Sequence, residues 1–380
     1  MLNFLMAAPW LLFPVFVIVL LRRRPRITDY EPAYGELPLV SIIVPARNEA
    51  INIGHCLSSL VTSSYPHREI IVVDDDSTDS TGDIARAFAE REPGQITVVN
   101  NDPLPEGWVG KSWACWTGYQ RSRGELLLFT DADTRHGEDL LAHAVGAQNR
   151  TSAGLVSLLP RQRMESFWER VILPHIFLAI MIRFPNSGRV SRTRNPRSVI
   201  ANGQFMLLPR GTYEAIGGHR AVRGYVVEDL AIAQAVVRSG QRMLLAHAYD
   251  VMDTRMYRSL REIIEGWTKN IALGAQLTLP PGIGILALWL GVLAGVVLWV
   301  VPPIVLAAGF LVGALARFRE WALIATLASL VGWLYTHLRM GAGVRAVLLY
   351  PLGALLSSFV VARSAIRGNR VEWRGRRYRV

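Results

Sequence analysis

Acidic residues are almost absent from the C-terminal part of this 380-residue chain, and this absence separates two regions of the sequence. Between residues 283 and 362 the chain is almost entirely apolar, and Glu320 is its only acidic residue. Cysteine is scarce as well, because Cys56 and Cys115 are the only two. Two cysteines exclude a disulfide framework and a zinc site of the usual spacing, so we expect buried thiols in a reducing compartment.

The N-terminal residues 1–24 are predicted to form a transmembrane anchor. Residues 2–21 carry no charge and are long enough to cross a bilayer, for which a helix needs about 20 residues. The basic residues Arg22, Arg23 and Arg24 follow this stretch, whereas a cleaved signal peptide begins with its positive charge. The positive-inside rule then places the domain that follows in the cytoplasm.

A second apolar region, residues 283–362, is divided by prolines at 302–303 and by basic residues at 317–320 and 339–345. These breaks predict about four membrane passes, and an even number returns the basic tail 363–380 to the cytoplasmic side. One of the four is short for a full span, so a re-entrant hairpin is an open alternative. The expected passes lie near 283–301, 303–316, 321–338 and 345–362.

The net charge of +11 is gathered in arginine clusters beside apolar stretches, at residues 22–24, 189–197 and 363–379. Clusters in such positions favour the anionic surface of a membrane over a nucleic acid. We therefore predict a membrane partner and no nucleic-acid partner. The mixed segment 167–184 fits an interfacial amphipathic helix and an ordinary core helix equally well.

Between residues 39 and 250 apolar runs alternate with amphipathic stretches, which predicts an α/β domain with a mostly parallel sheet covered by helices on both faces. The following segments carry this pattern. Strands are expected at 39–44, 69–73, 96–100 and 125–130, and helices at 51–63, 81–91, 112–121 and 230–238.

Polar residues follow three of these strands: Pro45–Glu49, Asp74–Asp76 and Asp131–Asp133. In an open parallel sheet the carboxyl ends of the strands meet at one edge, where ligands bind. Asp-X-Asp at such an edge suits a hard divalent cation, which prefers oxygen ligands. Each stretch alone is typical of a capped turn, but three at successive strand ends favour a site for a nucleotide and its diphosphate.

Over roughly residues 38–270 the chain resembles the family 2 glycosyltransferases, whose domain has the GT-A fold, a Rossmann-like mixed sheet that binds nucleotide-diphospho-sugars. The resemblance rests on residues 44–49, 72–79, 130–133 and 227–229, although Asp76 stands where glycine is usual. Residues 104–111, 265–270 and 373–376 resemble a membrane-anchored subgroup that acts on lipids, including hopanoid-associated and carotenoid glycosyltransferases.

The resemblance implies a role for each matching residue. The loop of Pro45, Ala46, Arg47, Asn48 and Glu49 would line the nucleotide pocket, and Asp75, with Asp74, would bind uracil. Lys111 would approach the nucleotide sugar, for which a solvated loop lysine is the alternative. Asp131 and Ala132 would contact the donor, and Asp133 with Asp131 would hold Mg²⁺ or Mn²⁺ on the diphosphate. Asp229 would be the catalytic base beside Glu228, although this acidic pair also suits a helix N-terminus.

The expected reaction is therefore the metal-dependent transfer, with inversion, of one sugar from a nucleotide-sugar donor, a UDP-sugar, to a lipid acceptor such as a hopanoid, a carotenoid or another lipid alcohol. Processive polysaccharide synthases of the family carry Gln-X-X-Arg-Trp after the base, and here only Trp267 of that motif remains. A processive synthase and a non-catalytic membrane scaffold are the alternatives. Asn202–Phe205 would either shape the acceptor side or form an ordinary strand entry. We expect an integral protein of a bacterial inner (plasma) membrane with its catalytic domain in the cytoplasm.

Overall fold

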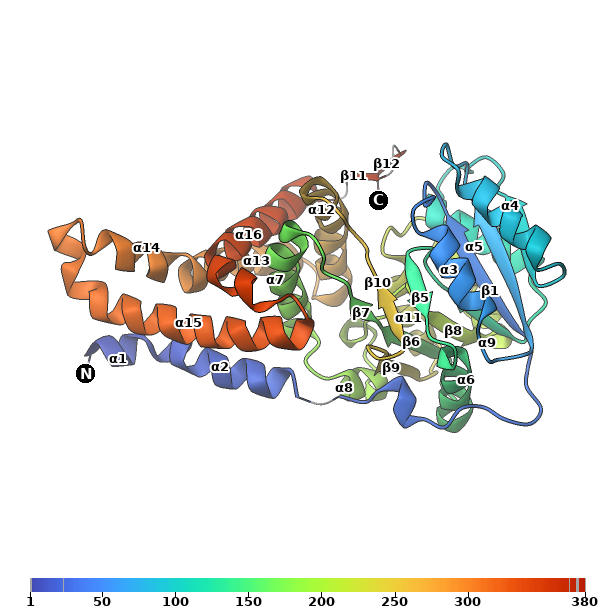
Figure 1. Ribbon diagram of the computed structural model, residues 1–380, viewed down its shortest axis with the longest axis horizontal. Coiled ribbons are helices and arrows are strands. Elements are labelled where there is room, and N and C mark those ends of the chain that lie inside the picture. Colours follow the sequence, from blue (N-terminus) through green and yellow to red (C-terminus); the bar gives the residue numbers. More distant parts are fainter. Residues whose placement is uncertain (1, 23, 369, 374–375, 380) are drawn as a thin grey trace. The chain divides into compact units, whose positions relative to one another are not determined.

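The computed structural model describes residues 2–22, 24–368, 370–373 and 376–379, and these form two compact units (Figure 1). The sheet unit comprises residues 24–162 and 187–256. The apolar unit comprises residues 2–22, 163–186 and 257–368 with the strands β11 (Arg370–Trp373) and β12 (Arg376–Arg379). Residues 163–186 and 257–270 therefore pack with the apolar unit, although the expected domain 38–270 included them.

The sheet unit is built on one seven-stranded mixed sheet with the order β3-β2-β1-β4-β8-β6-β9. The neighbours β3, β2, β1 and β4 are parallel, as are β6 and β9, whereas β8 runs antiparallel to β4 and β6. This arrangement confirms the predicted mixed α/β fold. The strands are β1 (Val40–Ala46), β2 (Arg68–Asp74), β3 (Ile96–Asn100), β4 (Leu126–Phe129), β6 (Leu155–Leu159), β8 (Met206–Pro209) and β9 (Met243–His247).

Alternate side chains of the central strands face opposite layers, as the pleat of a strand requires. Ile70 and Val72 of β2 belong to the main core, to which helix α3 (Ile53–Val61) contributes, whereas Ile71 and Val73 pack against Ala114 of helix α5 (Gly110–Arg121). The remaining helices and helical turns are α4 (Thr81–Arg91), α6 (Leu140–Thr151), α8 (Ser187–Arg192), α9 (Arg210–Ala215), α10 (Gly218–Ala221), α11 (Glu228–Arg238), η1 (Ile27–Asp29) and η2 (Pro196–Ser198).

A small second sheet follows directly on β4 and has the order β5-β10-β7. Its strands are β5 (Thr134–His136), β7 (Arg161–Gln162) and β10 (Met252–Thr254). Thr254 pairs with Thr134 in the antiparallel β5–β10 ladder. The turn of residues 131–133 therefore lies between the main sheet and this second sheet.

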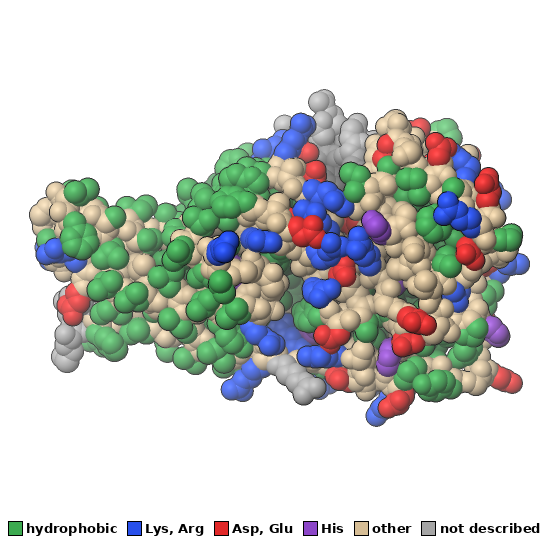
Figure 2. Space-filling view, viewed as in Figure 1, with side chains coloured by type: hydrophobic (Ala, Val, Ile, Leu, Met, Phe, Trp, Pro, Cys, Tyr) green, Lys and Arg blue, Asp and Glu red, His purple; other side chains and the backbone are tan. Residues whose placement is uncertain are grey.

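The apolar unit contains three helical stretches long and apolar enough to cross a membrane within the described residues: Ile283–Ala308, Gly313–Met340 and Val344–Arg367. Figure 2 shows hydrophobic side chains covering the visible face of these helices. The elements are α1 (Leu2–Met6), α2 (Ala8–Leu20), α7 (Phe167–Arg183), α12 (Leu260–Thr278), α13 (Ile283–Trp299), α14 (Val301–Ala308), η3 (Gly313–Phe318), α15 (Arg319–Met340), η4 (Val344–Leu349) and α16 (Tyr350–Arg367).

These three stretches differ from the four expected passes because the prolines do not separate two passes. Only Val300 lies between α13 and α14, and Pro302 and Pro303 stand in the first turn of α14. Proline is tolerated there because the first amide groups of a helix have no partner within it. The N-terminal segment also differs, since α2 is shorter than a full span.

The two ends of the C-terminal apolar region meet at α12, which directly precedes α13. The Ser364 hydroxyl near the end of α16 donates to the carbonyl of Thr268, and the amide of Ala272 donates to that hydroxyl. The middle of helix α7, residues 169–178, is mostly buried, whereas its two ends are partly exposed. Arg23, Arg374, Gly375 and the last residue of the basic tail lie outside the described residues.

Candidate functional site

The loops that follow β1 and β2 are bonded to each other along their length. The amide of Asp75 donates to the carbonyl of Ala46 over 2.8 Å, and the amide of Thr78 donates to Asn48 Oδ1 over 2.8 Å. Arg47 donates to the carbonyl of Asp76 over 3.0 Å. The loop that begins at Pro45 and the loop after β2 therefore lie against each other, as their positions at the ends of neighbouring parallel strands predict.

Glu49 lies at the end of the first loop, where its amide donates to Thr81 Oγ1 over 2.7 Å. Its carboxylate accepts a hydrogen bond of 2.7 Å from Asn52 Nδ2. These contacts hold Glu49 between the start of α4 and the turn that leads into α3.

The three aspartates after β2 have different surroundings. Asp74 Oδ1 accepts the amide of Ser77 over 3.1 Å, which makes Asp74 a turn residue. Asp75 is 5% exposed, and its Oδ1 accepts a hydrogen bond of 2.9 Å from Asn101 Nδ2. Asn101 in turn accepts the Thr117 hydroxyl over 2.7 Å. The sequence reasoning did not find Asn101 and Thr117, which orient the predicted uracil-binding carboxylate.

Asp76 adopts a left-handed backbone with φ of 59°, as does Asn48 with φ of 53°. Glycine adopts this conformation without a steric penalty, and aspartate and asparagine tolerate it better than most residues. This geometry explains how Asp76 can stand where the resemblance led us to expect glycine.

The turn of Asp131, Ala132 and Asp133 leaves β4 and is bonded through its carbonyl groups. Thr134 donates its hydroxyl to the carbonyl of Asp131 over 2.7 Å, and Thr254 of β10 donates to the carbonyl of Asp133 over 3.2 Å. Ala132 is buried, whereas both aspartates are partly exposed. The turn thus presents two carboxylates at the edge of the sheet, at the position the sequence predicts.

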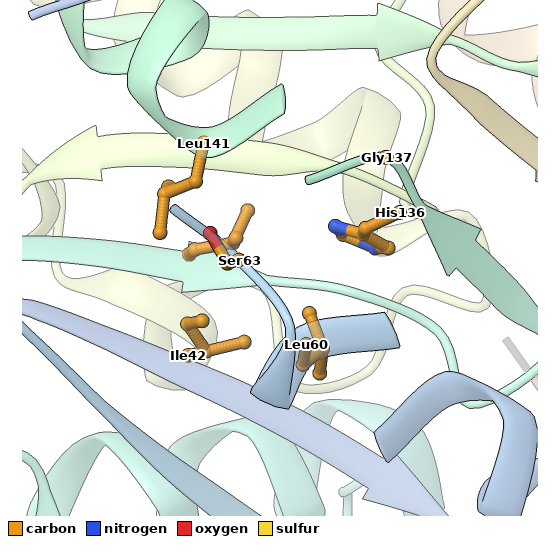
Figure 3. A pocket seen from close by; sticks show the side chains of 7 residues that line it. Ile42, Leu60, Ser63, His136, Gly137 and Leu141 are labelled. Atoms are coloured by element: carbon orange, nitrogen blue, oxygen red, sulfur yellow. The ribbon is translucent and has the colours of Figure 1, made fainter. Parts of the chain in front are cut away.

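Figure 3 shows a small pocket of mostly apolar character that contains none of the predicted site residues. His136 lies on its wall, and burial lowers the pKa of this histidine to about 3, so its ring is neutral. The lining residues are Ile42, Leu60, Ser63, Leu128, His136, Gly137 and Leu141.

Lys111, at the start of α5, joins the turn after β4 to the start of α11. Its Nζ lies 2.6 Å from Asp131 Oδ1 and 2.8 Å from Glu228 Oε1. Burial lowers the pKa of Lys111, but the carboxylates of Asp131 and Glu228 outweigh burial and raise this pKa well above its ordinary value. Lys111 is therefore a charged member of the cluster, in contrast to the solvated loop lysine that was the alternative.

Asp229 stands beside Glu228 in the first turn of α11. Its Oδ1 accepts the amide of Leu230 over 2.7 Å, and its Oδ2 accepts the amide of Gly203 over 3.0 Å. Burial and the neighbouring Glu228 raise the pKa of Asp229 to about 6, against the opposite effect of Lys111. A carboxylate with a pKa near 6 is suited to accept a proton at neutral pH.

Gly203 lies against this cluster, and it belongs to residues 202–205, for which the sequence left the acceptor side and an ordinary strand entry open. A Cβ at this position would lie 2.7 Å from Lys111 Nζ and 3.4 Å from Glu228 Oε1. Residues 202–205 form the turn that enters β8, and because β8 is antiparallel to β4, this turn lies at the edge where β4 ends. Chain topology, rather than a local motif, brings Gly203 to the site.

The protein offers only part of a metal coordination sphere at this edge. Among the described residues, no group of three or more His, Cys, Asp or Glu side chains gathers as a metal site. Mg²⁺ usually binds through one or two carboxylates together with substrate phosphates and water. Asp131 and Asp133 fit that pattern, although Asp131 also pairs with Lys111.

Comparison with known proteins agrees with this architecture. Residues 41–217 match the model of the glycosyl transferase family 2. The 4,4'-diaponeurosporenoate glycosyltransferases of Staphylococcus aureus strains MRSA252 and USA300 are each 26% identical over 361 residues, which cover 90% of this chain and 88% of theirs. A mannosyltransferase from Pyrobaculum calidifontis, solved in complex with GDP-Man and Mn²⁺, has a TM-score of 0.54 at 20% identity and covers 96% of this chain and 97% of its own. This likeness shows a shared fold.

Proposed function

We propose that this chain, which belongs to the glycosyl transferase family 2, transfers one sugar from a nucleotide-sugar donor to a lipid acceptor at a membrane. The observation that carries this proposal is the cluster of Lys111, Asp131, Glu228 and Asp229. Lys111 contacts both the turn after β4 and the start of α11, so the predicted donor turn and the predicted base belong to one site.

The donor side is formed by the loops after β1 and β2. Asn101 donates a hydrogen bond to Asp75, and Asp75 would accept a hydrogen bond from the base of the nucleotide. A buried carboxylate suits the ring N–H of uracil, which favours a UDP-sugar. The diphosphate would meet Asp131 and Asp133 through Mg²⁺ or Mn²⁺, and a bound cation supplies charge stabilisation for the leaving diphosphate.

A side chain of this protein would accept the proton that the acceptor hydroxyl loses. Asp229, held by the amides of Gly203 and Leu230, accepts the proton of the acceptor hydroxyl as that oxygen forms its bond to the anomeric carbon. The bond between the anomeric carbon and the diphosphate breaks in the same step, and the diphosphate leaves with the electron pair. One displacement of this kind inverts the anomeric centre.

The acceptor is argued from the apolar unit and from the relatives. Within the described residues, three stretches are long and apolar enough to cross a membrane, and the S. aureus relatives are named for a diaponeurosporenoate. That name denotes a carboxylate, which is ionised at neutral pH and needs no base. We therefore propose a lipid acceptor of the carotenoid type. A hydroxyl is the first candidate because the proposed base Asp229 has a role only with a hydroxyl, and a carboxylate is the second candidate because of the relatives' name.

The proposed location is a bacterial inner membrane with the sheet unit in the cytoplasm, where nucleotide-sugars are made. Arg189, Arg192, Arg194 and Arg197 are exposed on α8 and the segment after it, and basic residues of this kind favour the cytoplasmic side of a membrane. Protease accessibility of the sheet unit in inverted and right-side-out vesicles tests the orientation.

The activity is tested with purified full-length protein in lipid nanodiscs, Mn²⁺, a panel of UDP- and GDP-sugars, and lipid acceptors that end in a hydroxyl or a carboxylate. We expect release of one nucleoside diphosphate per sugar transferred, and mass spectrometry should find lipid carrying a single sugar. Products with long sugar chains would instead identify a processive synthase, and no release with any donor would refute the proposal.

A further inference from the structure

We infer that Gln204 and Thr254 are positioning residues that hold the donor turn of residues 131–133 in register with Asp229. This inference rests on the proposed function. It starts from the turn of residues 202–204, in which Gly203 bonds to Asp229 and the next residue bonds to the opposite side of the site. Neither Gln204 nor Thr254 belongs to a motif through which the chain resembles its family.

Gln204 is buried and fully engaged in hydrogen bonds. Its Nε2 donates to Thr254 Oγ1 over 3.2 Å, and its Oε1 accepts Asn202 Nδ2 over 3.0 Å. Its carbonyl accepts the Thr130 hydroxyl over 2.7 Å. The Thr254 hydroxyl in turn donates a hydrogen bond to the carbonyl of Asp133. Two successive hydrogen bonds therefore connect Gln204 to the donor turn.

The hydroxyl groups of Thr130 and Thr134 lie together with the ring of His136 beneath the turn. The Thr130 hydroxyl donates to the carbonyl of Gln204, and the Thr134 hydroxyl donates to the carbonyl of Asp131. His136 Nε2 lies 3.0 Å from Thr130 Oγ1 and 3.1 Å from Thr134 Oγ1. The two hydroxyl oxygens also lie 3.1 Å apart, so Thr130, Thr134 and His136 form one connected polar cluster beneath the turn.

The consequence is that two hydroxyl groups, those of Thr134 and Thr254, hold the carbonyl groups on either side of Ala132. Fixing both carbonyl groups fixes the direction in which the side chains of Asp131 and Asp133 leave the turn. The partners that orient metal ligands affect metal affinity about tenfold to a hundredfold when they are removed. Gly203, in the turn of residues 202–204, bonds to Asp229, so the turn that carries Gln204 would also hold the predicted base.

Thr254→Val gives the sharpest test, because valine keeps the shape of threonine, suits a strand and removes only the hydroxyl. The matched control is Thr212→Val, which removes another buried hydroxyl bonded to a glutamine, Gln241, over 2.8 Å. Calorimetry on the full-length protein would measure the binding of UDP and GDP, each with and without Mn²⁺.

We expect Thr254→Val to weaken Mn²⁺-dependent binding of the nucleoside diphosphate about tenfold and to leave metal-free binding unchanged. Gln204→Met should give the same pattern, and Thr212→Val should match the wild type in both. Wild-type binding in Thr254→Val, or an equal loss with and without Mn²⁺, would overturn the positioning role while the proposed function stands. If the wild-type protein binds neither nucleotide, the proposed function fails and the inference fails with it.

Discussion

The two sides of the site are built in different ways. On the nucleotide side, the loops after β1 and β2 bond to each other through neighbouring backbone and side-chain groups, for example Thr78 to Asn48. On the base side, Lys111, Gly203 and Asp229 come from three distant segments. The base side is also the one where burial and mutual charge shift pKa values strongly.

The proposed nucleotide side therefore follows from the order of the strands, whereas the proposed base side depends on the tertiary structure. A substitution on the nucleotide side should change affinity for one ligand. A substitution on the base side should change turnover and its dependence on pH, because several charges share one buried volume. The following predictions test that distinction, beginning with the largest expected effect.

Asp229→Asn should lower turnover about 10²- to 10⁴-fold with a hydroxyl acceptor, which is the usual contribution of a general base. Asparagine keeps nearly the shape of aspartate, so donor binding should remain close to that of the wild type. Single-turnover kinetics with calorimetry on the same samples would separate the two quantities.

The control for this variant is a comparison of two acceptors, one that ends in a hydroxyl and one that ends in a carboxylate. A carboxylate acceptor is already ionised and should lose little rate with Asp229→Asn. Turnover close to the wild-type value with a hydroxyl acceptor would contradict the assignment of the base.

Lys111→Met should come next in size and should change the pH profile. Activity of the wild-type protein should fall as pH drops through about 6, because Asp229, with a pKa raised to about 6, becomes protonated and can no longer accept a proton. Lys111 lowers that pKa, so its removal should raise the pKa further and move the acidic limb of the profile to higher pH. Rates measured between pH 5 and 9 give the result, and an unmoved limb would separate Lys111 from the base.

Asp75→Ala should mainly weaken nucleotide binding. A hydrogen bond to a charged group contributes about 1.5–3 kcal/mol, which corresponds to roughly tenfold to a hundredfold in the dissociation constant of UDP. Thr117→Val, which removes the outer bond of the chain from Thr117 through Asn101 to Asp75, should weaken UDP roughly twofold to fivefold, the equivalent of about 0.5–1 kcal/mol. Larger changes in turnover than in affinity would contradict a purely nucleotide-binding role.

The sequence predicted the α/β fold, the mixed sheet of the GT-A type and the approximate positions of eight elements of the sheet unit, of which helix α4 and strand β3 have the limits expected for them. It succeeded there because apolar periodicity is a local property. Three strand-end loops were also placed at one edge, since parallel strands leave no other arrangement. The roles of the individual site residues remain predictions.

The hydrogen bonds of Gly203, Gln204 and Thr254 could not be predicted for the opposite reason, although residues 202–205 had been considered for the acceptor side. They reach the site through the antiparallel strand β8 and through the second sheet, and pairings between distant strands are not visible in a local pattern. The expected four membrane passes became three stretches because the pattern of prolines does not distinguish a helix start from a break, and Pro302 and Pro303 lie at a start.

The smallest expected effect belongs to Asp76→Gly, on the nucleotide side. Asp76 has φ of 59°, and relief of a left-handed conformation favours glycine by about 1 kcal/mol, whereas the greater freedom of glycine in the unfolded chain costs roughly 0.5–1 kcal/mol. The ion pair with Arg47 spans 3.3 Å at a side chain that is 79% exposed, so its loss adds little. The two main effects nearly cancel, and the free energy of unfolding of the sheet unit should change by less than about 1 kcal/mol with turnover unchanged. A large loss of UDP affinity in this variant would show that the Asp76 carboxylate itself meets the nucleotide, which would give the chain's departure from the family's glycine a role in donor choice.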